Sequence, residues 1–420
     1  MNKKLWLLLA LLALLLAACG GGPGGGPAAP EEAGGGEEPA AGEMESAEED
    51  TAAAPEEAAT EAPAAGEMEN AEEDTAAAEE GPQLAEELSV YNWSDYIDEQ
   101  ILADYEEEYG VKIIYDTFAS NEDLLAKLQA GATGYDVIFP SDYMVAQMIE
   151  LGLLAEIDTA DIPNFANISD DFKDAPFDPG NKHCVPYQWG TTGIAYRAGY
   201  PYFEENEPNS WAYLFDPATL ENYADDGINV LNDQRELIGA ALFYLGYSPN
   251  STDRAQLEEA RDLILAAKPY WKTFNSEDYE DSLLVPDEVV LSHAWSGDAA
   301  GAYDNTYDEE TEDGNWYYAI PQEGAVKWVD NICIPASTER YETAVHFMNY
   351  LLDAEVGAAI TNYTFYASPN EAASEFIDPE ILEDPGIYPP DEVLAKLQWL
   401  EELGDGIFIW DEMWTAIKGQ

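Results

Sequence analysis

Positive charge is what this sequence has least of. It contains 16 Lys and Arg residues against 86 Asp and Glu, which gives a formal net charge of −70 at pH 7. A surface of that sign repels nucleic acid and anionic lipid headgroups, so we expect no nucleic-acid partner. It favours cationic ligands, or a high-salt environment in which a hydrated acidic surface keeps the protein in solution.

Signatures of catalysis are also lacking. The chain has three histidines, His183, His293 and His346, and it contains neither a Gly-x-Ser-x-Gly elbow nor a His-Glu-x-x-His motif. His346 stands beside Phe347 and Met348 in an amphipathic stretch, where a packed position is the simpler interpretation. These observations predict a protein that is not an enzyme and that uses no cofactor and no metal.

Cysteine is rare, with three residues in the chain, and the first of them carries information about location. Two lysines and the entirely apolar run Leu5–Ala18 precede Cys19, a pattern typical of a signal peptide and short for a membrane span. The residues around Cys19 resemble a bacterial lipobox, in which the cysteine becomes the mature N-terminus and carries lipid. Residues 1–19 therefore predict a lipoprotein signal, with the protein anchored to the outer face of the cytoplasmic membrane.

The other two cysteines, Cys184 and Cys333, lie in runs typical of strands. Export permits a disulfide bond between them. Two separate buried thiols fit the sequence equally well, so the pairing stays open.

Residues 20–87 have few large apolar side chains. The segment consists mostly of Ala, Gly, Pro and Glu, carries 21 acidic residues with no Lys or Arg, and repeats itself with an offset of 24 residues. A repeat of that length can indicate a solenoid, but two copies with so little apolar area cannot bury a core. The composition predicts a disordered acidic tether. Without residues 1–87 the chain keeps 65 acidic and 14 basic residues, a net charge near −51.

The remaining residues, about 88–420, are enough for two lobes with separate cores. Apolar, β-branched runs alternate with amphipathic stretches of ten or more residues, which favours α/β units with mainly parallel sheets. The expected strands cover 88–92, 111–118, 136–139, 185–196, 228–231, 289–295 and 328–334. The expected helices cover 98–109, 120–130, 144–151, 236–245, 253–267, 339–352 and 355–360.

Tryptophan and aspartate occur together at three distant places, Trp93–Tyr96, Trp295–Asp298 and Trp328–Asp330. Each lies at the end or the start of an expected strand, and ligands of open α/β sheets bind at the carboxyl ends of strands. An indole face attracts cations, and a neighbouring carboxylate accepts hydrogen bonds from an ammonium group. If the fold joins these units in one cleft, the cleft suits a slim molecule with amine ends and an apolar middle.

Two further polar segments follow expected strands, Pro140–Tyr143 and Asn232–Glu236. Taken singly, each fits a turn followed by a helix cap, with Asp233 as the cap and Glu236 completing a capping box. Like the tryptophan units, they lie at the ends of expected strands, and this shared position suggests a common site.

Six segments, taken in order, carry a resemblance to a known family: Tyr91–Tyr96, Lys112–Asp116, Ser120–Glu122, Asp136–Ser141, Pro186–Tyr196 and Trp328–Asp330. They resemble the bacterial polyamine-binding proteins of ABC transporters, over about residues 88–420. The resemblance implies an α/β, two-lobed type II periplasmic-binding-protein fold, with a ligand cleft between the lobes and crossing hinge strands. The lobes that it implies comprise 88–190 plus 330–374, and 194–326 plus 378–420.

The resemblance also implies a receptor that captures putrescine or spermidine outside the cytoplasm and delivers it to membrane permease subunits, and a monomer is usual for such receptors. The binding residues that it implies are an aromatic box of Trp93, Tyr96, Trp295 and Trp328, hydroxyl contacts from Ser94 and Ser141, amine-binding Glu236, Asp298 and Asp330, the further candidates Tyr143 and Asp233, and an aromatic wall at Tyr366.

The choice between the two polyamines stays open in the sequence. Asp298, Tyr366 and the segment Pro385–Pro390 resemble putrescine binders, whereas Tyr143, Asp233 and Trp328 resemble spermidine binders. Leu400 stands where spermidine binders carry a glutamine.

The alternative is a receptor of the same fold for a metal of the ferric-ion type, or for another organic cation. Ferric carriers use tyrosine, and Tyr317-Tyr318 is a superficial match. Two strand residues on opposite faces explain that pair more simply.

Overall fold

A computed structural model describes residues 83–131 and 134–419. The expected lipoprotein signal 1–19 with Cys19, and the expected tether as far as residue 82, lie outside the described residues. The first strand begins at Glu87, one residue before the expected start of the folded part. Within the described residues, none of the helices combines the length and the apolar character that a membrane crossing requires.

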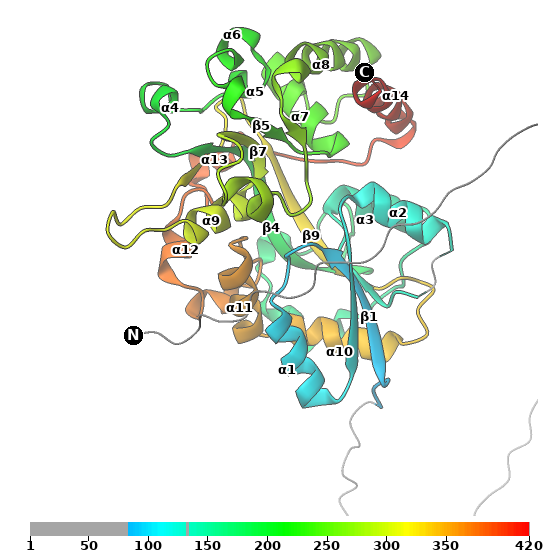
Figure 1. The fold of residues 1–420 in the computed structure, drawn as a ribbon. Coiled ribbons are helices and arrows are strands. Elements are labelled where there is room, and N and C mark those ends of the chain that lie inside the picture. Colours follow the sequence, from blue (N-terminus) through cyan, green and yellow to red (C-terminus); the bar gives the residue numbers. More distant parts are fainter. Residues whose placement is uncertain (1–82, 132–133, 420) are drawn as a thin grey trace, which may run out of the picture. The chain divides into compact units, whose positions relative to one another are not determined.

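Strand β4 (Cys184–Arg197) links two regions of one mixed sheet. Its first part pairs with β9 (Val326–Cys333), from Cys184 opposite Cys333 to Thr191 opposite Lys327. From Thr192 onward it pairs instead with β7 (Leu291–Trp295) and then β8 (Trp316–Ala319). In Figure 1, β4 and β9 run side by side between the two groups of helices.

We call the strands on the β1 side the first sheet region. There β1 (Glu87–Trp93) runs parallel to β2 (Lys112–Phe118) and to β3 (Val137–Ile138), and β3 pairs with β9. Side chains cap the N-termini of two flanking helices. The Asp98 carboxylate accepts a hydrogen bond from the backbone N–H of Gln100, and the Ser120 hydroxyl accepts one from the backbone N–H of Asp123. Three helices follow β1, β2 and β3 in turn: α1 (Glu99–Tyr109), α2 (Asn121–Gln129) and α3 (Asp142–Glu150). Two more follow β9: α10 (Tyr341–Leu351) and α11 (Ala354–Thr364).

The second sheet region contains β5 (Ile228–Val230), which runs parallel to β6 (Thr273–Phe274) and to β7. Its principal helices are α7 (Gln234–Leu245), α8 (Arg254–Ala267), α9 (Ser296–Asn305) and α14 (Ile407–Lys418). Gly246 ends α7 with a φ of 79°, a left-handed conformation that glycine adopts without steric cost. The short elements are α4 (Pro201–Glu205), α5 (Ala212–Phe215), α6 (Pro217–Leu220), α12 (Pro379–Glu383), α13 (Asp391–Leu394) and β10 (Gln398–Trp399).

The structure confirms the expected strands and helices to within a few residues, with two differences. The expectation of mainly parallel sheets holds only in part. Five of the nine described strand pairings are parallel, whereas β4 is antiparallel to β7, β8 and β9, and β3 is antiparallel to β9. Strand β9 carries the chain back toward the first region, so it runs opposite to β4 beside it. The helix expected to end at 360 extends to Thr364 and is closed by Phe365 at a φ of 58°.

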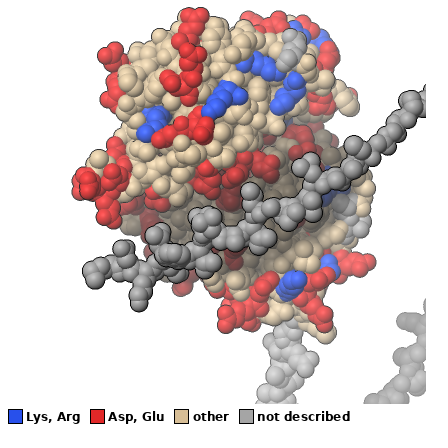
Figure 2. Space-filling model, in the orientation of Figure 1, with Lys and Arg blue, Asp and Glu red and all other residues tan. Residues whose placement is uncertain are grey.

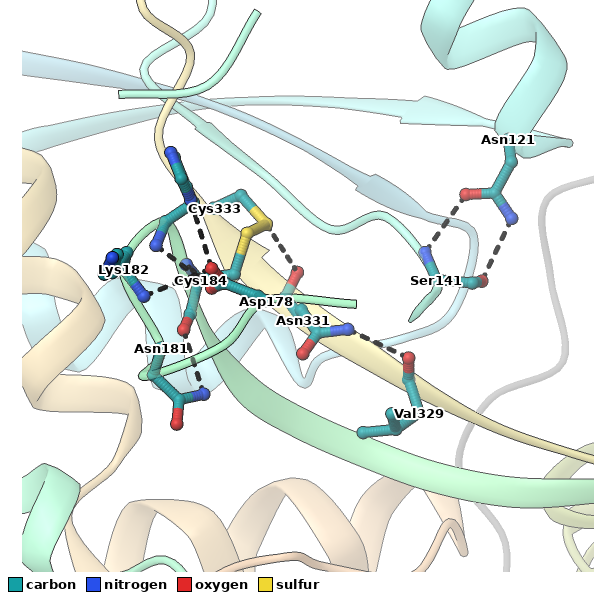
Figure 3. The surroundings of a disulfide bond; sticks show 10 residues. Asn121, Ser141, Asp178, Asn181, Lys182, Cys184, Val329, Asn331 and Cys333 are labelled. Atoms are coloured by element: carbon teal, nitrogen blue, oxygen red, sulfur yellow. Dashed lines mark hydrogen bonds and ion pairs between the residues drawn. A yellow bond between two sulfur atoms is a disulfide. The ribbon is translucent and has the colours of Figure 1, made fainter. Parts of the chain in front are cut away.

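A disulfide bond joins Cys184 at the start of β4 to Cys333 at the end of β9, across 149 residues of sequence (Figure 3). This settles the pairing that the sequence left open. Both cysteines are buried, and Asp178 accepts hydrogen bonds from the backbone N–H groups of His183 and Cys184 at 3.0 and 2.9 Å. The bond therefore fixes β4 to β9 at one end of their ladder.

Candidate functional site

One cavity of about 480 Å³ lies where the carboxyl ends of β1, β5 and β7 meet β9. The structure brings all twelve residues expected from the sequence into its lining. They are Trp93, Ser94, Tyr96, Ser141, Tyr143, Asp233, Glu236, Trp295, Asp298, Trp328, Asp330 and Tyr366.

Aromatic rings form much of the wall. The rings of Trp93 and Trp295 lie edge to face with centroids 6.1 Å apart, although they follow strands of different sheet regions. The Tyr366 ring lies 5.2 Å from that of Trp328 and 5.3 Å from that of Tyr96. A Cβ added at Gly297 would stand 2.6 Å from the Tyr366 ring, so glycine there allows the close approach of α9.

Hydrogen bonds hold the three indoles in place. The Nε1–H of Trp93 donates to the Phe139 carbonyl at 2.8 Å, and that of Trp328 donates to the Thr192 hydroxyl at 3.2 Å. The Nε1–H of Trp295 donates to Glu236 at 3.3 Å. Rings that are fixed in this way offer preformed faces to a cation or to methylene groups.

Asp330 is a buried carboxylate with both oxygens engaged. The Tyr96 hydroxyl donates to Oδ2 at 2.8 Å, and the Ser141 hydroxyl donates to Oδ1 at 2.6 Å. Asn121 in turn donates to the Ser141 hydroxyl at 3.0 Å, an interaction drawn in Figure 3. Burial raises the pKa of Asp330 to about 7, against the lowering effect of the two hydroxyl donors. Ser141 therefore orients Asp330, rather than offering a free hydroxyl to a ligand.

Glu236, in the first turn of α7, is buried, and one of its two carboxylate oxygens lacks a hydrogen bond. Its Oε1 accepts from Trp295, while Oε2 has no hydrogen-bond partner among the described residues. Burial, and then the nearby charge of Asp233, raise the pKa of Glu236 to about 8. A buried carboxylate oxygen without a donor is costly, so this oxygen suits a contact with a cationic ligand.

Asp233 has the structural role that the sequence offered as an alternative. Its carboxylate caps α7 by accepting from the backbone N–H groups of Arg235 and Glu236, at 2.8 and 3.0 Å. It still lines the cavity, but its hydrogen-bonding capacity is partly used within the protein.

The charged side chains that the structure describes in the cavity lining are all acidic. The lining that the structure describes contains no Lys or Arg, and nine carboxylates: Asp95, Asp233, Glu236, Asp278, Glu280, Asp281, Asp298, Asp304 and Asp330. Figure 2 shows the wider setting, with Asp and Glu spread over the visible face and Lys and Arg in a few places. Such a cavity repels anions and concentrates cations.

Comparison with known proteins agrees with this site. The family described as bacterial extracellular solute-binding protein matches residues 100–389. The chain is 37% identical to a putrescine-binding periplasmic protein of Pseudomonas aeruginosa, over 75% of this chain and 87% of the relative. It is 36% identical to a putrescine-binding periplasmic protein of Escherichia coli, over 79% and 91%. The chain is a bacterial extracellular solute-binding protein.

The fold of this solute-binding protein agrees with solved structures. A putative spermidine/putrescine ABC transporter protein from Listeria monocytogenes superposes with a TM-score of 0.72 at 34% identity, over 80% of this chain and 99% of that one. The two-lobed fold of periplasmic binding proteins, expected from the sequence resemblance, is thereby confirmed. Membership of the family also places the protein outside the cytoplasm.

The site of this solute-binding protein includes acidic residues that sequence reasoning missed. Glu280 lines the cavity near Asp298, and Asn305 donates to its Oε1 at 2.9 Å. Burial raises the pKa of Glu280 to about 8 and that of Asp298 to about 6; hydrogen bonds from Tyr279 and Tyr366 lower the latter. Glu280 begins a single π-helical turn between β6 and β7, and no motif in the sequence marks it.

The metal alternative finds no support in the part of the chain that the structure describes. No group of three or more His, Cys, Asp or Glu side chains there is arranged to hold an ion. Tyr317 and Tyr318 lie in β8 outside the cavity lining; Tyr317 is exposed, and the Tyr318 hydroxyl is hydrogen-bonded with that of Thr191.

Proposed function

We propose that this solute-binding protein captures a polyamine, putrescine or spermidine, and delivers it to an ABC importer. The observation that carries the proposal is the unpartnered Oε2 of Glu236, which lies in an aromatic cavity lined by carboxylates. The names of its relatives, which describe putrescine-binding proteins, support the same ligand class.

The chemistry of a polyamine fits each part of the cavity. Every buried methylene contributes roughly 0.8 kcal/mol, and the indole faces cover methylenes well. A desolvated cation–π contact adds roughly 2 kcal/mol. Each ammonium needs a counter-charge when it leaves water, and Asp330, Glu236 and Asp298 offer three.

The pocket favours the shorter ligand. Two residues that resemble those of spermidine binders already have partners within the protein, since Asp233 caps α7 and the Tyr143 hydroxyl donates to Glu122 at 3.3 Å. Leu400, which stands where the resemblance places a glutamine of spermidine binders, is buried and apolar and offers the cavity no side-chain acceptor. We therefore propose that putrescine binds more tightly than spermidine.

Transport requires closure rather than catalysis. We propose lobes of 88–190 plus 330–374 and 194–326 plus 378–420, which meet where β4 exchanges β9 for β7. A ligand that contacts both lobes shifts the open–closed equilibrium toward the closed form, which then docks as a monomer on the permease subunits. Lipid on Cys19 and the tether of residues 20–87 would keep the receptor at the membrane.

A thermal-shift screen tests the ligand class. Putrescine, cadaverine, spermidine and spermine are compared with ferric iron on one sample that lacks residues 1–19. We expect stabilisation to grow with the logarithm of polyamine concentration, reaching roughly 2.7 kcal/mol at a hundredfold excess over Kd. A larger increase in melting temperature with putrescine than with spermidine at the same concentration supports the proposed preference. A response to iron and to no polyamine would overturn the proposal.

A further inference from the structure

Arg235 stands out as a guanidinium enclosed by protein. It lies in the first turn of α7 and is 1% exposed. One nitrogen, Nη2, donates to the Asn250 side chain at 3.0 Å and to the Glu401 carbonyl at 3.1 Å. Its Nε has no hydrogen-bond partner among the described residues. Arg235 is not part of the cavity lining, so its place in the binding process needs another explanation.

The guanidinium lies over two aromatic rings, from opposite sides of the cleft. Its Cζ is 4.9 Å from the ring centroid of Trp410 and 4.8 Å from that of Tyr143. Trp410 belongs to α14, which packs on α7 and α8 in the second sheet region. Tyr143 belongs to α3, which packs on α2 and β9 in the first sheet region.

Charge on the α3 side complements the guanidinium. Asp142, at the start of α3, is 1% exposed, and its Oδ2 has no hydrogen-bond partner among the described residues. Glu122 of α2 accepts a hydrogen bond from the Tyr143 hydroxyl. Glu122 and, to a smaller extent, Asp142 act electrostatically on Arg235, as does Asp233 at the start of its own helix. The first sheet region thus presents a ring and two acids to a cation that is held by the second.

We propose that Arg235 is a positioning residue that stabilises the closed form of the receptor. Asn250, Glu401 and Trp410 fix it to the second sheet region, and it reaches the first only through the Tyr143 ring and the acids beside it. That contact forms when the lobes close and is lost when they open. Because Glu236 is the next residue in the same helical turn, capture of an amine and closure of the lobes are coupled through α7.

Among the described residues, no salt bridge joins Arg235 to the first sheet region, and this affects the open–closed equilibrium. A direct salt bridge between Arg235 and the first region would favour closure without ligand. A cation over a ring at 4.8 Å adds a modest attraction, so the empty receptor stays able to open and the ligand decides the equilibrium. The inference rests on the proposed function, because it needs a ligand that closes the lobes.

A double-mutant cycle tests the contact. Arg235→Met, Tyr143→Leu and the double variant are titrated with putrescine and are also unfolded without ligand. We expect Arg235→Met to weaken binding about tenfold, mainly through faster dissociation. In affinity, the double variant should lose clearly less than the product of the two single losses. In ligand-free unfolding the two losses should be additive, because the open form lacks the contact.

A matched control is Arg254→Met in α8, whose arginine pairs with Glu412 at the surface and should leave affinity unchanged. If Arg235→Met lacks the wild-type circular dichroism spectrum, Arg235→Lys replaces it, because lysine keeps the charge and loses the planar face.

The two possible failures are distinguishable. Additive losses in affinity, or coupling of the same size in ligand-free unfolding, overturn the role of Arg235 and leave polyamine binding intact. Absence of polyamine binding by the wild-type protein overturns the proposed function itself.

Discussion

Two carboxylates of the cavity differ in how completely the protein satisfies them. Asp330, in β9, accepts from two hydroxyls, and Asn121 supports one of these donors. Glu236, in α7, accepts a long hydrogen bond from the Trp295 indole and is also stabilised by the Thr192 hydroxyl, while its Oε2 has no hydrogen-bond partner among the described residues. The first sheet region therefore supplies a prebuilt anchor, and the second supplies a charge that only a ligand completes. A receptor built in this way gains stability in its closed form only when it is loaded.

The largest expected effect comes from the prebuilt anchor. Asp330→Asn removes the charge but keeps the shape, and the buried ammonium then lacks its counter-charge. We expect putrescine affinity in calorimetry to fall about 100-fold or more, with an unchanged circular dichroism spectrum. Asp391→Asn, at an exposed position outside the cavity lining, is the control. Affinity like that of the wild type would remove Asp330 from the site.

The second prediction concerns the unsatisfied acid. Glu236→Gln should weaken putrescine binding about tenfold to 100-fold, because the ligand loses a buried counter-charge. Unlike Asp330→Asn, it should leave the ligand-free protein at least as stable, since a buried carboxylate without a partner disappears. Calorimetry and thermal unfolding of both variants test the difference. An unaltered dissociation constant, or a clear loss of ligand-free stability, contradicts it.

Part of the candidate site could be predicted from the sequence, and part could not. Residues at the carboxyl ends of strands share an edge of the sheet, so Trp93, Glu236 and Trp295 could be placed together from their position after a strand. The sequence also offered Asp233 as the cap of α7, and the structure has it there. The role of Ser141 could not be predicted, because its hydrogen bond to Asp330 depends on a three-dimensional contact between distant segments.

Other features had no sequence signal. Helix α9 contains Gly297 and Gly301, which are poor helix formers, and it is glycine at 301 that lets Glu280 lie against the helix, 2.6 Å from where a Cβ would be. Glu280 itself begins a π-helical turn in a segment for which the sequence predicted no element and no site. The disulfide pairing required the register of β4 against β9, which no local pattern encodes.

The third prediction is a pH dependence. In the closed form that the structure describes, burial raises the pKa values of Asp330 and Glu236 to about 7 and 8, from ordinary values of 3.8 and 4.5. Between these limits this form binds more protons than the unfolded chain, so its stability without ligand falls as pH rises from about 4 to about 8. A polyamine favours the ionised acids, so its affinity should increase from pH 6 to pH 8.

Proton release measures this linkage. Calorimetry at pH 7 in two buffers of different ionisation enthalpy should show protons leaving the protein as putrescine binds, and Glu236→Gln should release fewer. Binding that is independent of pH, with no proton release, would show that both acids are already ionised in the empty cavity.

The smallest effect on binding should come from the disulfide. Replacing Cys184 and Cys333 together with serine removes a cross-link over 149 residues, and we expect a loss of roughly 2–5 kcal/mol in unfolding free energy. Neither cysteine lines the cavity, so putrescine affinity at 25 °C should change by less than about twofold. Denaturant unfolding and calorimetry check the two parts. A large loss of affinity would mean that the disulfide-linked ends of β4 and β9 help to position Asp330.

Titration of putrescine into the wild-type protein by calorimetry tests the central claim most directly. The aromatic, carboxylate-lined cavity predicts one ligand for each chain, a dissociation constant in the micromolar range or below, and weaker binding in high salt. An absence of binding heat at millimolar putrescine, together with no shift of the melting temperature, would contradict it.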